Sequence, residues 1–376
     1  MAGLQFSRNT KVYIKQGATN IWEVPVLDGY SFSQGTNTSE IALSEMESTT
    51  GVSRRGRTMF NDSLAPAEWS FDAYVRPNSG ANTTSLAVEE CLWANFVAAN
   101  AYTPATGVWT AGVTKPANTN TVAFDFDDSN KSTLGTFNIY FVLGACDVPD
   151  GVYTAASGLT TVYKIEECVA NSASVDFEID GIAMVSWSGF GKKITEVGDF
   201  NSTTGGISTG VSSTTNFIRN RLTSLTVTAA NTTAFAGAGG GVYNVTLTGG
   251  NITLENGITY LTPETLCTVN EPIGHVTGGR NISGSFSCYL TSAAGGSEDL
   301  FESMMTGGLS EVQNSFALSF SIGGSNNPKV VFSMPTCHLE VPTHSIDDVI
   351  SVETSFHALP NTIGGTNEVV VTYTGA

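Results

Sequence analysis

The stretch V-D-F-E-I-D-G-I-A-M-V-S-W-S-G-F-G, from Val175 to Gly191, alternates apolar and polar residues with a period of two. Successive side chains of a β-strand point to opposite faces of a sheet, so the alternation predicts one long, half-buried strand. At about 3.4 Å per residue, about fourteen residues of this strand would run for roughly 45 Å and would need a long partner. Its polar face would carry the carboxylates Asp176, Glu178 and Asp180, which water must screen.

The composition favours a mainly β protein with a strongly acidic surface. The 376 residues include 40 glycines, and 34 acidic residues against 16 basic ones give a net charge of −18. Short apolar runs are broken by Gly, Asn and Pro, as they are between short strands. The acidic surface would repel nucleic-acid phosphates, and the chain lacks the basic patch of a sequence-specific DNA or RNA reader.

Membrane, metal and cofactor signatures are missing from the sequence. The chain has no run of about 18 apolar residues, and its first residues lack the apolar segment of a signal peptide. We therefore expect a soluble protein that is made in a cytosol. The six cysteines are too sparse for a disulfide scaffold and form no C-x-x-C pair, so no metal and no cofactor is predicted.

No catalytic constellation is found, and the chain is not expected to be an enzyme. The run G-I-S-T-G, from Gly206 to Gly210, matches a nucleophile elbow, but no strand precedes it and no helix follows it. The three carboxylates of the long strand have the residue type of a glycosidase pair. Their spacing at every second residue is explained more simply by a charged surface.

The rest of the chain predicts a series of short strands around one early helix. The strands are expected over residues 5–14, 21–33, 40–47, 67–76 and 137–143. Residues 85–99 predict a helix with Trp93 and Phe96 on its apolar stripe and with Glu89 and Glu90 off that stripe.

Three further segments predict irregular chain. Residues 101–136 are rich in Thr, Asn, Gly and Pro and predict an inserted excursion rather than core, and residues 201–216 predict a flexible linker. Residues 48–62 cannot bury themselves and predict an exposed loop, which holds Arg54, Arg55 and Arg57. Two interpretations of this loop stay open: a solvated mobile loop, and an arm that becomes ordered against an acidic partner such as another copy of the chain.

Comparison of the chain with itself reveals five matches in the same order. F-S-R-N recurs as F-I-R-N, S-F-D-A-Y-V as S-F-S-C-Y-L, E-C-L-W as E-D-L-F, F-N-I-Y-F-V-L as F-A-L-S-F-S-I, and residues 163–189 lie over residues 332–358 without a gap. The order predicts two tandem copies of one β-rich unit, over residues 1–200 and 217–376. The second copy lacks the excursion, and its Asp347 and Glu353 keep a sparser acidic face.

The opening L-Q-F-S-R-N-T-K-V-Y-I and the run Y-K-I-E-E-C-V-A-N-S-A-S-V-D-F-E-I-D-G-I-A-M-V-S-W-S-G-F-G resemble the major tail tube proteins of long-tailed bacteriophages. The likeness is to the subgroup with two tube domains in one chain, and it is strongest over residues 1–200. It implies a mainly β fold with two tandem β-sandwich or barrel domains, each with a flanking α-helix. In that family the chains form stacked rings with a β-barrel inner wall, so three duplicated chains would close one pseudo-sixfold ring.

The resemblance also implies site residues and partners. The residues expected to face the lumen, where they would repel passing genomic DNA, are Asp176, Glu178, Asp180, Asp347 and Glu353. The residues expected in an inter-subunit or inter-ring loop are Arg54, Arg55 and Arg57. Implied partners are other copies of the chain and tape-measure, tail-terminator and baseplate proteins, with transiting DNA bound without sequence specificity and no membrane; a tail sheath stays open.

The implied location is the virion tail, after assembly in the cytoplasm of the bacterial host. One alternative function stays open: a surface decoration or adhesin-like β-sandwich module on a virion, which would bind glycans through exposed Trp and Tyr.

Overall fold

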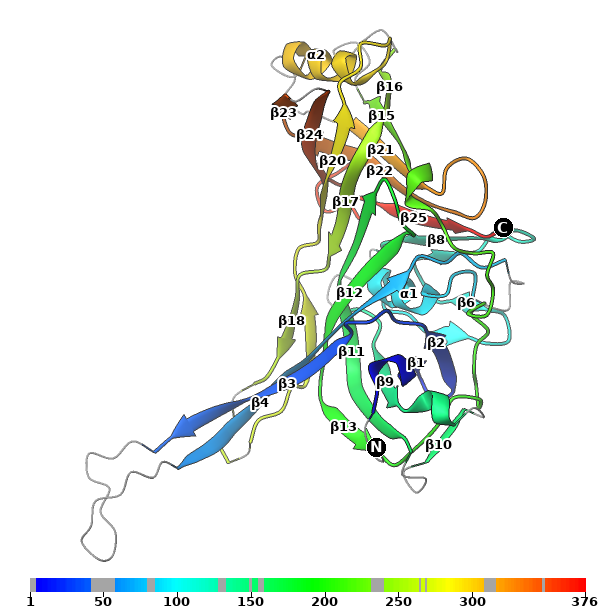
Figure 1. Ribbon diagram of the computed structural model, residues 1–376. Coiled ribbons are helices and arrows are strands. Elements are labelled where there is room, and N and C mark those ends of the chain that lie inside the picture. The colour runs from blue at the N-terminus through cyan, green and yellow to red at the C-terminus, as the bar shows by residue number, and fades with distance from the viewer. Residues whose placement is uncertain are drawn as a thin grey trace, which may run out of the picture.

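The computed structural model describes residues 5–41, 58–79, 85–127, 133–148, 151–154, 159–230, 240–263, 265–267, 269–307, 316–346 and 349–376. The protein is mainly β, as the sequence predicts, and Figure 1 shows an elongated body with a long two-stranded arm that projects from it. The described residues form two α-helices, of which α1 lies inside the body and α2 lies at its far end.

The first half, residues 1–200, builds two antiparallel sheets that share one strand. One sheet has the order β2-β1-β9-β11-β13, and the other has the order β3-β4-β12-β11. The shared strand β11 is long enough to serve both sheets because it bends at bulges between Ile165 and Ser172. The elements are β1 (Lys11–Gln16), β2 (Asn20–Val24), β3 (Ser31–Glu40), β4 (Met59–Tyr74), α1 (Glu90–Val97), β9 (Phe137–Leu143), β11 (Thr161–Glu178), β12 (Met184–Gly191) and β13 (Ile194–Val197).

Shorter elements fill the connections. They are η1 (Ser7–Asn9), β5 (Tyr102–Thr103), β6 (Val108–Trp109), β7 (Val113–Thr114), β8 (Thr121–Asp125), η3 (Ala145–Asp147), β10 (Val152–Thr154), β14 (Asp199–Asn201) and η5 (Asn220–Leu222).

The second half, residues 217–376, pairs its strands in the order β16-β15-β21-β22-β25. A second run of strands has the order β17-β20-β24, and β24 also pairs with β22 and with β23. A small hairpin, β18–β19, separates β17 from β20. The elements are β15 (Ser224–Ala229), β16 (Val242–Val245), β17 (Leu247–Glu255), β18 (Ile258–Leu261), β19 (Gly274–Thr277), β20 (Asn281–Tyr289), α2 (Ser297–Gly307), β21 (Phe316–Ile322), β22 (Lys329–Leu339), β23 (Thr343–Ile346), β24 (Ile350–Ala358) and β25 (Val370–Thr374).

The two halves are joined edge to edge and share a core. Residues 172–178 of β11 pair antiparallel with residues 249–255 of β17, and β25 pairs with β8. The largest cluster of buried side chains crosses between the halves. Within it the indole of Trp93 on α1 packs at 6.3 Å from Phe332 and donates a 2.8 Å hydrogen bond to the Tyr373 hydroxyl.

The stretch from Val175 to Gly191 is a hairpin, so the prediction of one continuous strand is wrong. β11 ends at Glu178, β12 begins at Met184, and the two strands pair with each other. Gly181 in the turn has a φ of 107°, a conformation that glycine adopts without a Cβ clash, and Asp-Gly is a common hairpin turn signal. The polar–apolar alternation continues through the turn, which is why periodicity alone indicates a single strand.

Residues 101–136 contribute to the core, so the expectation of an excursion outside it is wrong. Tyr102, Trp109 and Phe124 are buried in the main cluster, and the indole of Trp109 stacks on that of Trp22 at 5.5 Å. Strand β8 from this segment also pairs with β25 of the second half. The aromatic residues spaced among Thr, Asn and Gly therefore contribute large apolar side chains to the core.

Residues 201–216 also differ from the free linker that their composition predicts. The Ile21 N–H donates to the Gly205 carbonyl at 3.0 Å, and the Ile207 N–H donates to the Ile21 carbonyl at 2.7 Å. The buried guanidinium of Arg76 donates to the carbonyls of Val211 and Ser213 at 2.7 and 2.8 Å. These bonds fix the connection along the surface of the first half.

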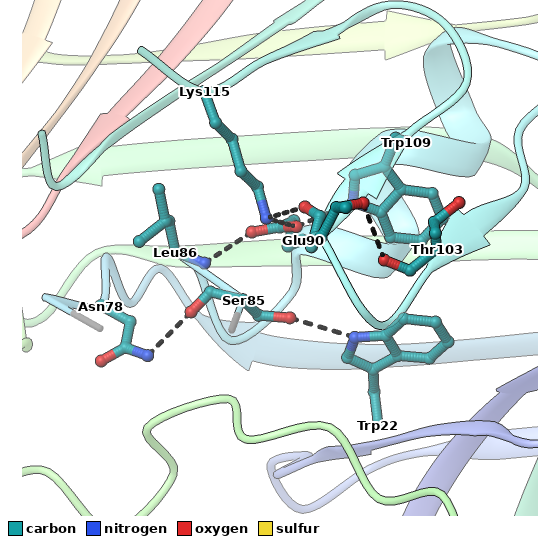
Figure 2. Close-up of polar contacts among 10 residues, drawn as sticks. Trp22, Asn78, Ser85, Leu86, Glu90, Thr103, Trp109 and Lys115 are labelled. Atoms are coloured by element: carbon teal, nitrogen blue, oxygen red, sulfur yellow. Dashed lines mark hydrogen bonds and ion pairs between the residues drawn. The ribbon is translucent and has the colours of Figure 1, made fainter. Parts of the chain in front are cut away.

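A buried ionic network anchors the start of α1 (Figure 2). Glu90, which the sequence places off the apolar stripe, is fully buried and accepts from the Leu86 N–H at 2.5 Å and from Trp109 Nε1 at 2.7 Å. Lys115 Nζ lies 2.5 Å from the same carboxylate. The ion pair therefore ties the segment 101–127 to the helix, and only a carboxylate can accept from all three donors.

Glu89, the neighbouring residue, is equally buried but lacks such a cation. Its Oε1 accepts from the Arg76 N–H at 3.3 Å, and burial raises the pKa of its carboxyl to about 7. The Tyr373 hydroxyl and the charge of Arg76 act in the opposite direction. Glu89 and Glu90 lie off the apolar stripe, as the sequence predicts, but both are buried because no face of α1 is exposed to solvent.

Candidate assembly interface

The acidic residues of the long hairpin lie on the solvent face of a continuous sheet. Val175 and Phe177 are buried, so Asp176 and Glu178 point to the opposite face, where both are exposed as the sequence predicts. Pairing carries this face across the halves, since Glu178 lies opposite Gly249, Gly249 opposite Ser287, and Ser287 opposite Glu353. Glu178 and Glu353 therefore belong to one cross-strand row.

Small polar side chains cover the rest of this surface, which we call the acidic face. It runs over β3, β4, β12, residues 172–178 of β11, β17, β20 and β24. None of these segments contains a lysine or an arginine. The row through Asp176, for example, continues with Asn251, Ser285 and Ser355. A surface that carries carboxylates and lacks lysine and arginine repels an anionic polymer.

The remaining predicted site residues are placed differently. Asp180 lies in the hairpin turn, where its carboxylate is exposed and stands 3.5 Å from the Arg221 guanidinium. A surface pair of this kind contributes little stability. Asp347 and the three arginines Arg54, Arg55 and Arg57 lie outside the described residues.

Two strands of the continuous sheet each have one partner among the described residues. β3 pairs with β4, and β23 pairs with β24. In the first half, the strand edge that corresponds to the unpaired edge of β23 belongs to β11, and β17 of the second half pairs with it. An unpaired strand edge exposes a row of backbone donors and acceptors, which is a template for adding another strand. Sequence periodicity cannot find these edges because it carries no information on which strands become neighbours.

A projecting arm accompanies each half. The outer parts of β3 and β4 form the first arm, and the β18–β19 hairpin forms the second arm, which runs beside the base of the first (Figure 1). The first arm exposes Met59 and Phe60, whose side chains are 58% and 54% accessible. Large apolar side chains on a projection indicate a surface that another molecule covers.

Chemistry of other kinds is not indicated. Within the described ranges, no group of three or more His, Cys, Asp or Glu side chains is arranged to hold a metal ion. All six cysteines are free thiols; Cys91, Cys168, Cys288 and Cys337 are buried, and burial raises their pKa. The described helices include none that is long and apolar enough to cross a membrane.

Comparison with known proteins finds a similar phage protein. No family model matches the chain. The chain is 29% identical over 379 aligned residues to "Tail tube protein pb6" of Escherichia phage T5, and the match covers 97% of this chain and 75% of the relative. The match extends through both halves of the chain. A tail tube is built from many copies of one protein, and a β-rich subunit with unpaired strand edges suits such an assembly. This similarity supports a phage tail tube protein, a structural subunit of the virion tail rather than an enzyme.

Proposed function

We propose that three copies of the chain close a ring by the same joint that connects the two halves within one copy, and that such rings stack into a tube. The observation that carries this proposal is the β11–β17 joint together with the open edges of β23 and β3. A head-to-tail contact of this type generates a closed ring when its rotation fits. Ring closure would then pair the open edge of β3 with that of β23 in the next copy.

The pairing schemes of the two halves support a tandem duplication. The first half pairs β1 with β2, β1 with β9, β9 with β11, β12 with β4 and β4 with β3. The second half pairs β15 with β16, β15 with β21, β21 with β22, β24 with β20 and β20 with β17. The order is the same, and a helix follows β4 in one half and β20 in the other. In this scheme the domains are residues 1–200 and 217–376.

The duplication assigns a register to the joint between copies. Ser31 takes the place of Asn251, because the partners Ser70 and Ser285 are matched by the internal repeat. Ser345 takes the place of Asp176 in the matched stretch of the second half. Since Asp176 lies opposite Asn251 within the chain, Ser345 of one copy would lie opposite Ser31 of the next.

The acidic face would line the bore of the tube. Its carboxylates and the absence of lysine and arginine from its strands are the features that support this placement. A DNA duplex that passes through an anionic, hydrophilic wall meets no cation to hold it, so the genome slides. Tape-measure, terminator and baseplate proteins would contact the ends and the lumen of such a tube, which would assemble in the host cytoplasm. The inter-ring role of Arg54, Arg55 and Arg57 stays a prediction.

Purified protein is expected to form rings or tubes visible by negative-stain electron microscopy. The physical reason is that the open edges of β3 and β23 gain backbone hydrogen bonds only through another copy. A chain that stays monomeric at high concentration, and that no nucleating tail component recruits, would contradict the proposed function.

Reversing charge on the acidic face is expected to make assembled tubes retain DNA. Asp176→Lys with Glu178→Lys changes two exposed residues, so the fold should persist, and a short duplex should co-sediment with the tubes in a salt-dependent way. DNA held in a bore should resist nuclease. The matched control is Glu196→Lys with Asp199→Lys, which adds the same charge at exposed positions of β13 and β14. Equal nuclease sensitivity of the DNA on both variants would refute a lumenal acidic face.

A further inference from the structure

The two halves meet along two strand pairings. The first is the β11–β17 joint on the acidic face, and the second joins residues 121–125 of β8 to residues 370–374 of β25. We call the second pairing the β8–β25 seam, and Figure 1 shows its strands side by side near α1. The seam has five residue pairs against seven in the joint, so it is the weaker backbone connection between the halves.

A buried carboxylate lies beside this seam. Glu89 directly precedes α1 and is 0% exposed. The Tyr373 hydroxyl of β25 interacts with the carboxyl group of Glu89 and also accepts the 2.8 Å hydrogen bond from Trp93 Nε1. Glu89 Oε2 is closed off from water and has no hydrogen-bond partner among the described residues. A residue of the other half therefore covers this carboxylate without satisfying it fully.

Arg76, the cation next to Glu89, is engaged elsewhere. Its guanidinium donates to the carbonyls of Val211 and Ser213 at 2.7 and 2.8 Å and lies 4.4 Å from the ring centroid of Phe217. Its backbone N–H is the group that donates to Glu89, at 3.3 Å. The charge of Arg76 is thus directed toward the connection between the halves.

The other titratable groups around Glu89 are anionic or neutral. Glu90 is paired with Lys115 and takes up the charge of that lysine. Burial raises the pKa of the Cys91 thiol well above its ordinary value, and burial together with the charge of Glu89 does the same to the pKa of the Tyr373 hydroxyl. An ionised Glu89 would be a buried anion without a paired cation, which is a costly state.

We propose that a proton on Glu89 keeps the β8–β25 seam closed, and that ionisation of Glu89 opens this seam while the β11–β17 joint stays paired. The two halves then hinge about the sheet that carries the acidic face. Opening moves Tyr373 away and lets water reach the carboxylate, which removes the cost of the buried anion. The device lies within one chain and does not depend on the proposed ring.

The direction of the pH response follows from the pKa of Glu89. Burial raises the pKa of its carboxyl to about 7 in the closed state, and water returns that pKa to about the ordinary 4.5 in the open state. The proton's contribution to the closed seam is therefore fully present below about pH 4.5 and is lost as pH rises to about 7. The open population should grow by about 70-fold between pH 5 and pH 8.

Two more carboxylates lie at the seam, and neither has the surroundings of Glu89. Asp125 of β8 is exposed, although its partial burial raises the pKa of its carboxyl. Glu368, which precedes β25, is paired with the Arg280 guanidinium at 3.0 Å. Because water reaches Asp125 and Glu368 has a cation, neither is a buried anion without a counter-charge.

Hydrogen exchange of the full-length chain, followed by mass spectrometry below the concentration of assembly, tests the proposal. Protection factors are corrected for the intrinsic pH dependence of exchange and compared at pH 5 and pH 8. Peptides from residues 121–125 and 370–374 are expected to lose about 70-fold in protection, whereas residues 172–178 and 249–255 keep theirs. A loss shared equally by all strands would indicate global unfolding, and that result or an unchanged seam would overturn the proposal.

Two single variants identify the responsible group. Glu89→Gln cannot ionise, so its seam is expected to keep at pH 8 the protection that it has at pH 5. Asp125→Asn is the matched control, because it removes an exposed carboxylate of the same seam and should leave most of the pH response in place. A response that Asp125→Asn abolishes and Glu89→Gln retains would contradict the role of Glu89.

A disulfide across the seam keeps the test independent of how well Glu89→Gln folds. Ala123 and Thr372 are direct cross-strand partners and are half-buried, so Ala123→Cys with Thr372→Cys places two thiols across the seam. The exposed Cys146 and Cys267 are first replaced by serine. At pH 8 the oxidised chain is expected to keep the seam protected and the reduced chain to lose protection. Equal protection of both forms would show that the seam does not open.

Discussion

Glu90→Gln is expected to lower the free energy of unfolding by about 3–5 kcal/mol, the usual loss when one partner of a buried ion pair is removed. The Glu90 carboxylate accepts from the Leu86 N–H, from Trp109 Nε1 and from Lys115 Nζ, and the side chains of Glu90 and Lys115 are 0% and 7% accessible. Glutamine would turn an N–H₂ group toward one of these donors and leave the ammonium without its counter-charge. The midpoint of urea unfolding, followed by tryptophan fluorescence, measures the loss.

The double variant Glu90→Gln with Lys115→Met tests the cause. Removing both charges of a buried pair is far less destabilising than removing one, so the double variant should recover most of the lost stability. A double variant as unstable as Glu90→Gln alone would show that the ion pair is not the origin of the effect.

Glu89→Gln is the matched control for Glu90→Gln. It changes the adjacent, equally buried glutamate, but it is expected to raise the free energy of unfolding at pH 8 instead of lowering it. The folded-state pKa of Glu89 is about 7, above its ordinary 4.5, so the folded state holds the proton more tightly. The wild-type protein should therefore lose up to about 3 kcal/mol as pH rises from about 4.5 to 7. Glutamine cannot ionise, so this variant should be more stable than wild type at pH 8 and should lack that pH dependence.

Cysteines at Ser31 and Ser345 are expected to link neighbouring copies into covalent rings under oxidising conditions. Both side chains are exposed and small, and the proposed register places them opposite each other, at a Cβ separation of about 4.5–5.5 Å. The same register pairs Ser33 with Thr343, which gives a second expected cross-link. The exposed thiols Cys146 and Cys267 are first replaced by serine. Non-reducing gels should show dimers and then a closed trimer as the largest species.

Diagonal pairs at the same four positions provide the control. Ser31→Cys with Thr343→Cys, and Ser33→Cys with Ser345→Cys, are two residues out of register, at about 7–8 Å in cross-strand geometry. They should cross-link much more slowly than the matched pairs. Equal rates for matched and diagonal pairs would refute the register, and a ladder that extends beyond three chains would refute the trimeric ring.

Local pattern in the chain predicts several elements well. Strand β9 spans Phe137–Leu143, as the alternation indicates. The exposure of Asp176 and Glu178 also follows from sequence, since their neighbours Val175 and Phe177 must be buried. These features depend on residues close in the chain, where a period of two leaves a direct trace.

Other properties depend on contacts between distant residues. Glu90 is off the apolar stripe of its helix, yet it is buried, because Lys115 and Trp109 reach it from another segment. The composition of residues 101–136 predicts a loop, yet β8 from this segment pairs with β25, and the indole of Trp109 stacks on that of Trp22 in the core. The periodicity of the sequence cannot predict these contacts, because they join residues that are far apart in the chain.

The sequence by itself determines a mainly β, acidic chain with an internal repeat and a polar strand face, and two of its stretches resemble phage tail tube proteins. Only the tertiary structure decides that the long stretch is a hairpin, that β17 pairs with the edge of β11, and that β3 and β23 each have one partner among the described residues. The physical reason is that the alternation of apolar and polar residues determines which face of a strand is exposed to solvent. It does not determine which strand pairs at the edge, because backbone hydrogen bonds can form with any strand of suitable alternation.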